Sequence, residues 1–282
     1  MRRSYIRRRV IRIRGVENLK SFKVYATLAA LFFIAIILFY TITFYGFLDP
    51  ETRGSLAVFD LIPALAALFA LVSVSQLLLV FRRGDPPRLI WTLILAAVLL
   101  NLIAEITWFV YEIIIWTEVP YPSLADYFWL ASYIPFFLAI TILISRYRKM
   151  GLTFRRRSLF VVIPLIVIIL VLVTIAVTAP IFSDPEAALA DKLINPAYVY
   201  LDFIILVPAL LMTFAFAKGA QGKPWQLIAY CFILFAVGDI AYAYMAWNGL
   251  YSTGNHIDIL WTCGYLLLAI AAAYQKDMVR RG

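Results

Sequence analysis

The chain has 282 residues, of which 64% are hydrophobic and only 15% are charged. An ordinary soluble domain is roughly half apolar and about a quarter charged, so this composition excludes that class and indicates an integral membrane protein. The net charge of +9 does not indicate nucleic-acid binding, because the basic residues gather at particular ends of the apolar segments. We therefore expect the lipid bilayer as the main partner, and no nucleic acid.

Eight apolar segments are long enough to cross a hydrocarbon layer of ~30 Å, which takes about 20 helical residues. They lie at roughly 24–46, 58–81, 89–115, 124–145, 159–181, 198–217, 225–247 and 257–275. The first segment is too long for a cleavable signal peptide and lacks a small-residue cleavage site. We predict an all-α integral membrane protein with eight transmembrane helices.

Most Lys and Arg residues lie in connections that would be on the same side of the membrane; Arg53 and Lys192 are the exceptions. The other basic residues precede the first span and follow the second, fourth, sixth and eighth, whereas the alternate loops carry mainly Asp and Glu. Because basic residues favour the cytoplasmic side, we expect both termini in the cytoplasm and the protein in the cell membrane. The basic arm at residues 1–23 fits a topogenic anchor, with contact to anionic lipid as the alternative.

One stretch of the chain occurs twice. Glu105-Ile106-x-Trp108 matches Asp239-Ile240-x-Tyr242, and Asp126-x-x-Trp129-x-x-x-Tyr133 matches Asp258-x-x-Trp261-x-x-x-Tyr265. Further matches pair Asp49-Pro50-Glu51 with Asp184-Pro185-Glu186, Asp60 with Asp202, and Trp91 with Trp225. We predict a parallel tandem repeat of four spans each, residues 24–149 and 150–282.

Glu105 and Asp239 each lie inside an apolar span. A carboxylate there costs about 2.5–3.5 kcal/mol on insertion scales, so it usually faces the bundle interior and has a partner. Hairpin turns near residues 119 and 252 bring Tyr133 level with Glu105, and Tyr265 level with Asp239. We expect each tyrosine to donate to the acid of its own hairpin. The alternative is that the acids bind a cation, an amine or a proton.

Two further acids open helices. Ser123-x-x-Asp126 and Asn255-x-x-Asp258 resemble capping boxes, although ligand contact is the alternative for both carboxylates. The two Asp-Pro-Glu motifs read as an N-cap and the first turn of short surface helices.

Aromatic residues gather on the same side as these acids. Trp and Tyr form belts at membrane interfaces, but Trp108 and Tyr242 lie too deep for a belt, three residues beyond an intramembrane acid. Rings beside carboxylates suit an organic cation, and a flat hydrophobic molecule such as a quinone is equally compatible. The candidate ligand-binding residues are Glu105, Trp108, Asp126, Trp129, Tyr133, Asp239, Tyr242, Asp258, Trp261 and Tyr265.

No motif indicates an enzyme. The HExxH, GxSxG, Walker and GxGxxG patterns are absent, and His256 is the single histidine. We expect no catalytic residues, no metal and no cofactor.

The segment Pro122-Ser123-Leu124-Ala125-Asp126-Tyr127-Phe128-Trp129 with Tyr133, and the weaker match at Asp258, Trp261, Gly264 and Tyr265, are similar to a known domain type. They resemble the polytopic N-terminal membrane sensor regions of archaeal and bacterial histidine kinases and GGDEF-type diguanylate cyclases. The similarity is clearest over residues 105–145 and 235–275. It implies a signal received in or outside the membrane and passed to a cytoplasmic output through the last helix.

The sequence ends seven residues after Gln275 without a kinase or GGDEF domain. We therefore expect either a stand-alone homologue that acts through a cytoplasmic signalling partner or a homo-oligomer, or a tie that is only architectural. The favoured function is a receptor-like sensory module with an outward-facing acidic and aromatic cavity between the repeats. The alternatives are a transporter of a small solute, cation or proton, and a structural subunit of a membrane complex.

Overall fold

The computed structural model describes residues 19–117, 119–149, 156–215 and 222–281, and every element in these ranges is helical. In chain order the elements are α1 (Lys20–Phe44), α2 (Arg53–Leu78), α3 (Pro86–Phe109), the π-helical turn η1 (Val110–Ile115), α4 (Leu124–Lys149), α5 (Arg156–Val173), the π-helical turn η2 (Thr174–Thr178), α6 (Ala179–Ser183), α7 (Leu189–Ala215), α8 (Lys223–Trp247) and α9 (Asp258–Val279).

The predicted eight long apolar helices are confirmed. Within the described residues, eight helices are long and apolar enough to cross a membrane, counting α3 with η1, and α5 with η2 and α6, as one each. The expected short helices at the two Asp-Pro-Glu motifs are wrong. Asp49 and Asp184 instead accept the backbone N–H of Glu51 and Glu186 at 2.9 and 2.8 Å, because an aspartate before proline closes a local turn as readily as it caps a helix.

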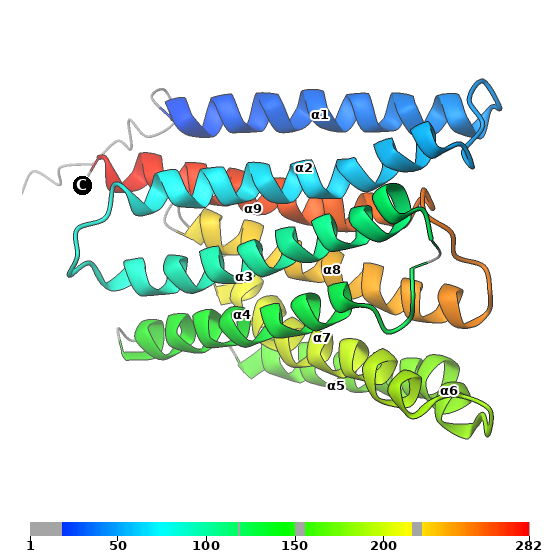
Figure 1. The fold of residues 1–282 in the computed structure, drawn as a ribbon. Coiled ribbons are helices and arrows are strands. Elements are labelled where there is room, and N and C mark those ends of the chain that lie inside the picture. The colour runs from blue at the N-terminus through cyan, green and yellow to red at the C-terminus, as the bar shows by residue number, and fades with distance from the viewer. Residues whose placement is uncertain (1–18, 118, 150–155, 216–221, 282) are drawn as a thin grey trace, which may run out of the picture.

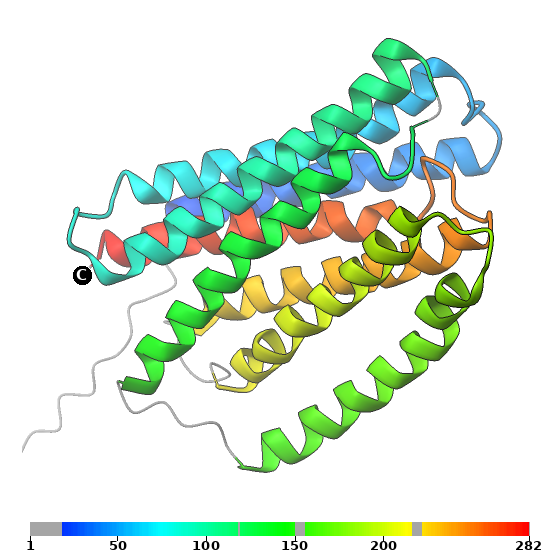
Figure 2. The same ribbon diagram turned by 60° about the horizontal axis from the view of Figure 1, so that its bottom comes forward.

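The helices lie nearly parallel in one bundle, and neighbours in the bundle are often far apart in the chain (Figures 1 and 2). Consecutive pairs α2–α3, α3–α4, α7–α8 and α8–α9 pack closely, as short connections require. The long-range pairs are α2 with α9 along much of their length, α1 with α9, and α4 with α7 over a shorter stretch. The last helix therefore packs against both early helices of the chain.

Small residues bring α2 and α9 close together. Ala66, Ala67 and Ala70 of α2 and the alanines at 269 and 271–273 of α9 have no exposed surface. Without large side chains the backbones approach closely, and Ser73 Oγ donates to the Ala269 carbonyl across the interface at 2.7 Å. This contact fixes the position of α9 beneath the cavity described below.

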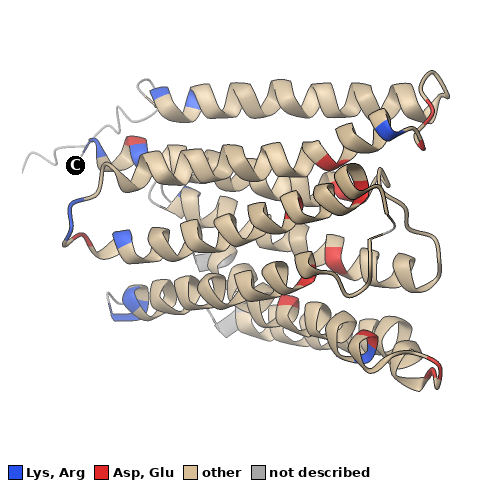
Figure 3. Cartoon of the chain, viewed as in Figure 1, with Lys and Arg blue, Asp and Glu red and all other residues tan. Residues whose placement is uncertain are grey.

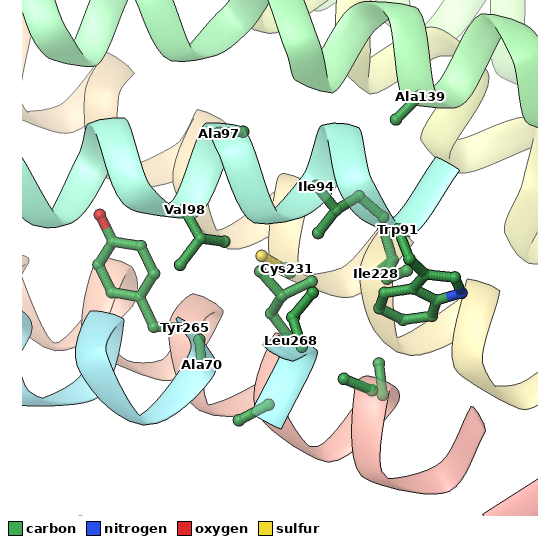
Figure 4. Packing of buried hydrophobic residues seen from close by; sticks show 14 of the residues in the cluster. Ala70, Trp91, Ile94, Ala97, Val98, Ala139, Ile228, Cys231, Tyr265 and Leu268 are labelled. Atoms are coloured by element: carbon green, nitrogen blue, oxygen red, sulfur yellow. The ribbon is translucent and has the colours of Figure 1, made fainter. Parts of the chain in front are cut away.

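The core continues from this interface toward α3, α4 and α8 (Figure 4). Trp91 and Trp225, which match in the sequence, pack with ring centroids 5.5 Å apart, and Trp225 Nε1 donates to the Tyr147 hydroxyl at 3.1 Å. Bulky apolar packing thus fills the end of the bundle at which α3 and α8 begin.

Charged residues separate along the bundle axis (Figure 3). Lys and Arg cluster where α2, α4 and α9 end and where α1, α3 and α8 begin, whereas most Asp and Glu lie toward the opposite end. We refer to these as the basic end and the acidic end. Most of the basic arm at residues 1–23 and part of the boundary between the expected repeats, residues 150–155, fall outside the described residues.

Candidate functional site

A cavity of about 120 Å³ opens among α2, α3, α4, α7, α8 and α9, in the half of the bundle nearer the acidic end. All ten residues that the sequence singled out line it: Glu105, Trp108, Asp126, Trp129, Tyr133, Asp239, Tyr242, Asp258, Trp261 and Tyr265. Helices from both halves of the chain thus bring the two matched sets of residues together.

The tyrosine pairing differs from the one expected. The Tyr265 hydroxyl donates to Glu105 Oε1 at 3.0 Å and lies 3.1 Å from Asn101 Oδ1, both on α3. The Tyr133 hydroxyl lies 2.8 Å from Asp239 Oδ2. Each tyrosine therefore contacts the acid of the other hairpin. This is possible because α4 packs against α7 as well as α3, and α9 packs against α2 as well as α8.

Within each hairpin, a tryptophan takes the place expected of the tyrosine. Trp261 Nε1 donates to Asp239 Oδ1 at 2.7 Å, and the matching Trp129 side chain lies against the Glu105 carboxylate. Gly238 allows the first contact, since a Cβ at that position would lie 2.9 Å from Trp261 Nε1. Each of the two acids is thus held by a tryptophan of its own hairpin and a tyrosine of the other.

Asp202 of α7 joins the cluster around Tyr133. Its Oδ1 lies 2.7 Å from the Tyr133 hydroxyl, which also contacts Asp239, and its Oδ2 is buried with no hydrogen-bond partner among the described residues. The Asp202 side chain is only 4% exposed and lines the cavity.

Asp60 of α2 is the other poorly satisfied acid. It is 5% exposed and lines the cavity beside Glu112, and its Oδ2 also has no hydrogen-bond partner in the described part of the chain. A buried polar atom normally has a partner, so both carboxyl groups are exceptions that require an explanation.

Asp126 has the capping role that its spacing indicates. Its Oδ2 accepts the backbone N–H of Ser123 at 2.6 Å and the Ser123 hydroxyl at 2.8 Å, at the first turn of α4. Its Oδ1 accepts the Tyr198 hydroxyl from α7 at 3.0 Å. The carboxylate therefore both caps α4 and ties α4 to α7.

Asp258 does not form the expected capping box with Asn255. Helix α9 begins at Asp258 itself, and the carboxylate reaches further back, accepting the Gly254 N–H at 3.0 Å and the Tyr251 hydroxyl at 3.1 Å. Burial, and then the neighbouring negative charge of Asp258, raise the pKa of Tyr251 well above its ordinary range. The phenol thus keeps its proton and remains a donor.

The rim at the acidic end is held by η1. The Glu112 carboxylate accepts the Thr253 hydroxyl from the α8–α9 loop at 2.9 Å. Arg53 donates to the Ile113 carbonyl and lies 5.1 Å from the ring of Trp116. Insertions of π type are frequent at functional sites, and this one carries Glu112, whose carboxylate lies beside Thr253 and Asp60 of the lining.

The rest of the lining is aromatic. Tyr242 packs against Tyr251 and Trp261 with ring centroids 4.6 and 6.1 Å apart, and Trp108 lies 5.8 Å from Trp129. His256 lies outside the lining and packs against Tyr40 and Phe44 of α1.

Sequence reasoning missed several lining residues. Asp60 and Asp202 had been noted only as markers of the repeat, although an acid inside an apolar span is itself a signal. Among the other polar lining residues, the sequence analysis did not single out Ser132, Asn195, Tyr198 and Thr253. No group of three or more His, Cys, Asp and Glu in the described residues is arranged to hold a metal ion. The site can therefore supply negative charge, hydrogen-bond acceptors and aromatic faces.

One protein family matches most of the chain. The family described as "Domain of unknown function (DUF4084)" matches residues 20–207, which cover α1 to α6, the first part of α7, and the positions of Asp60, Glu105, Asp126 and Asp202. No curated protein and no solved structure matches the chain. Because the match covers well over half of its length, the chain belongs to the DUF4084 family.

Proposed function

We propose that this protein is a membrane-embedded, receptor-like sensory module that binds a small ligand or cation in the acidic and aromatic cavity. One observation carries the proposal: six carboxyl groups, of Asp60, Glu105, Asp126, Asp202, Asp239 and Asp258, line one cavity in which the described residues place no Lys, Arg or His. Six carboxyl groups without a basic side chain among them favour a positively charged occupant.

The helix surfaces support a position within the bilayer. Apolar side chains cover the outer faces of α1, α5 and η2, including Leu31 at 59%, Phe160 at 77% and Ile175 at 65% exposed. A soluble monomer rarely exposes apolar surface so continuously, whereas lipid tails solvate it. The basic end then belongs in the cytoplasm with both termini, which puts the cavity on the outer side of the cell membrane.

Two four-helix repeats, residues 24–149 and 150–282, account for the contacts around the cavity. The matched tyrosines, Tyr133 and Tyr265, both cross to the intramembrane acid of the other half. The matched tryptophans Trp129 and Trp261 both stay with the acid of their own half. These two pairs of matched residues therefore make matched contacts, as two copies of one unit would.

A route for the signal is available through α9. Its first two turns carry Asp258, Trp261 and Tyr265 at the cavity, and its last turn carries Asp277, whose Oδ2 accepts the Phe22 N–H of α1 at 2.9 Å. A ligand that moves the cavity end of α9 therefore also moves the basic end, where a cytoplasmic partner would respond. This reading agrees with the resemblance to sensor regions.

Ligand-dependent stability of a cavity-filled variant tests the proposal. Ala243 lines the cavity and is 2% exposed, so Ala243→Leu fills space there, whereas Ala246 lies on the outer face of the same helix and Ala246→Leu is the matched control. Thermal unfolding of the purified protein in lipid nanodiscs is measured against small organic cations and neutral molecules. We expect stabilisation of the wild type and of Ala246→Leu, and none of Ala243→Leu.

Flux measurements separate the receptor from a transporter. The protein reconstituted in vesicles should bind the stabilising compound without moving it across the bilayer. Uptake that disappears in Glu105→Gln and Asp239→Asn would show that the protein is a transporter and not a receptor. Equal stabilisation of the wild type, Ala243→Leu and Ala246→Leu would show that the compound does not bind in the cavity.

A further inference from the structure

We propose that the ligand is a small primary or secondary ammonium ion, bound through its N–H groups beside Asp202. This inference rests on the proposed function and names the chemical class that the cavity takes. It excludes three other classes, namely a bare metal ion, a quaternary ammonium ion and a neutral molecule.

Few hydrogens are available for the hydrogen bonds around Tyr133. Its hydroxyl oxygen lies 2.7 Å from Asp202 Oδ1 and 2.8 Å from Asp239 Oδ2, but a phenol carries one hydrogen and can donate fully to one acceptor. Two carboxyl groups therefore share one donor. At least one more hydrogen is needed for both Asp202 and Asp239 to accept a hydrogen bond at the atoms that face Tyr133.

The hydrogen deficit is greatest at Asp202. Asp239 has a second donor, Trp261 Nε1, at 2.7 Å, whereas Asp202 Oδ2 is buried with no donor among the described residues, and the Asp202 carboxyl group lies against that of Asp239. A carboxylate that is 4% exposed and only half satisfied is costly, because it has neither water nor a full set of protein donors. Because Asp202 lines the cavity and lacks a hydrogen-bond donor, it favours a ligand that carries N–H or O–H donors.

The same shortage recurs across the cavity at Asp60, which is 5% exposed and has a partnerless Oδ2 in the described structure. By contrast, Asp126 and Asp258 each accept two or more hydrogen bonds from their own helix starts and from neighbouring tyrosines. Asp60 of α2 and Asp202 of α7, which match in the sequence, are thus the two acids that lack donors. Asp126 and Asp258, which lie at helix starts, do not lack them.

The class of cation follows from the geometry. A metal ion is disfavoured because no three carboxyl groups, histidines or cysteines of the described chain converge at coordinating distance. A quaternary ammonium has no N–H and leaves Asp202 Oδ2 unpaired. A primary or secondary ammonium supplies both the charge and at least two donors, and charge-assisted hydrogen bonds are about twice as strong as neutral ones.

The size and walls of the cavity define the rest of the ligand. A volume of about 120 Å³ is slightly below the roughly 150 Å³ of an engineered cavity that takes benzene. Phe136, Phe232 and Phe235 add apolar surface next to Tyr133 and Tyr198. The ammonium group therefore carries a short apolar body of no more than about six heavy atoms.

Three probes with five heavy atoms each test the inference. Butylammonium has the charge and three N–H donors, tetramethylammonium has the charge without donors, and 1-butanol has one donor without the charge. Affinities are measured by isothermal titration with the full chain in nanodiscs. We expect butylammonium to bind at least tenfold more tightly than either of the others.

Two substitutions locate the binding. Asp202→Asn keeps the shape, removes the charge and should weaken butylammonium binding at least tenfold. Asp85→Asn removes a carboxyl group from the α2–α3 connection at the basic end, outside the lining and away from α9, and should leave the affinity unchanged. Thermal unfolding verifies that both variants fold, and Asp202→Glu, which restores the charge, should recover part of the affinity.

The outcomes separate this inference from the proposed function. Equal affinity for tetramethylammonium, equal affinity in Asp202→Asn, or no butylammonium binding at all would each overturn the ammonium inference. The last outcome is expected if a proton held by Asp202 or Asp239 already supplies the missing hydrogen. If 1-butanol binds best and Ala243→Leu abolishes its binding, the receptor proposal stands without the ammonium. If Ala243→Leu changes the binding of no probe, both proposals fail.

Discussion

Removing the Tyr265 hydroxyl tests the contact between the two halves of the chain. Tyr265 is 2% exposed, and Tyr265→Phe keeps the ring, its packing and its T-shaped contact with Phe235. The loss is confined to the hydrogen bonds to Glu105 at 3.0 Å and Asn101 at 3.1 Å. The substitution therefore isolates one polar link between α9 and α3.

The expected magnitude follows from the partners. Interhelical hydrogen bonds in membranes contribute ~0.6 kcal/mol on average and at most ~1.7 kcal/mol, because the unfolded chain also finds partners in the membrane. Hydrogen bonds to charged groups in soluble proteins contribute roughly 1.5–3 kcal/mol. Because the hydroxyl contacts a buried carboxyl group and an amide oxygen, we expect a loss near the upper membrane limit, about 1.5 kcal/mol.

Reversible unfolding in mixed micelles measures this loss. Tyr274→Phe is the matched control on the same helix, since the described residues give its hydroxyl no hydrogen bond and its ring keeps the contact with Phe22. We expect that control to change the unfolding free energy by less than ~0.5 kcal/mol.

A double-mutant cycle identifies the partner. Tyr265→Phe combined with Glu105→Gln should be non-additive by ~0.5 kcal/mol or more, since residues in contact couple by that amount. The coupling with Asp239→Asn, the acid of the same hairpin, should be smaller. A larger coupling with Asp239 than with Glu105 would refute the crossed pairing and restore the pairing within each hairpin.

Three further predictions concern single contacts, and each is measured as a change in unfolding free energy. Gly238→Ala should destabilise the protein by about 1–3 kcal/mol because the added Cβ displaces Trp261 from Asp239. Gly54→Ala is the control, since a Cβ there meets nothing within 4 Å, and an equal loss in both variants would contradict this prediction. Asp126→Ala should cost ~1–3 kcal/mol by leaving the Ser123 N–H without its acceptor and the Tyr198 hydroxyl with only the Asp126 carbonyl, and Asp126→Glu should recover less than half of that. Asp277→Ala should cost about 1 kcal/mol and speed hydrogen exchange at the Phe22 amide, and unchanged exchange there would remove its role as the α1 cap.

The membership of the cavity could be predicted from local patterns. An acid inside an apolar span must face protein rather than lipid, and a residue three positions further on shares that face. These two rules select Glu105 with Trp108 and Asp239 with Tyr242. The matched spacing then adds the second helix of each hairpin, and all of these residues line one cavity.

The partners of these residues could not be predicted in the same way. Counting from a hairpin turn gives the height of a side chain in the membrane but not the neighbour that it faces. Tyr265 is level with both intramembrane acids, and only the packing of α9 between α2 and α8 directs it to Glu105. That packing depends on contacts between residues about 200 positions apart, such as Ser73 with Ala269.

Asp60 and Asp202 escaped selection for a related reason. Each is the only acid in the apolar part of its helix, with no aromatic residue three positions further on that would have marked a site. The importance of Asp202 appears only when the hydrogen bonds around Tyr133 are counted, since that count needs α4, α7 and α8 in place. A shortage of donors is a property of the assembled site, which no single helix reveals.

The crossed contacts also bear on how the proposed receptor would respond. Asp239 holds both Trp261 of α9 and, with Asp202, Tyr133 of α4. An ammonium ion that pairs with Asp202 frees the Tyr133 hydroxyl to donate to Asp239 Oδ2 alone, which changes the charge on the carboxylate whose Oδ1 accepts Trp261 Nε1. From Trp261, α9 runs 16 residues to Asp277, about 24 Å as a rigid helix, and Asp277 holds the start of α1. Because a ligand can shift a conformational equilibrium only through contacts that differ between its states, the Asp239–Trp261 hydrogen bond is the contact at which such a difference would reach the basic end.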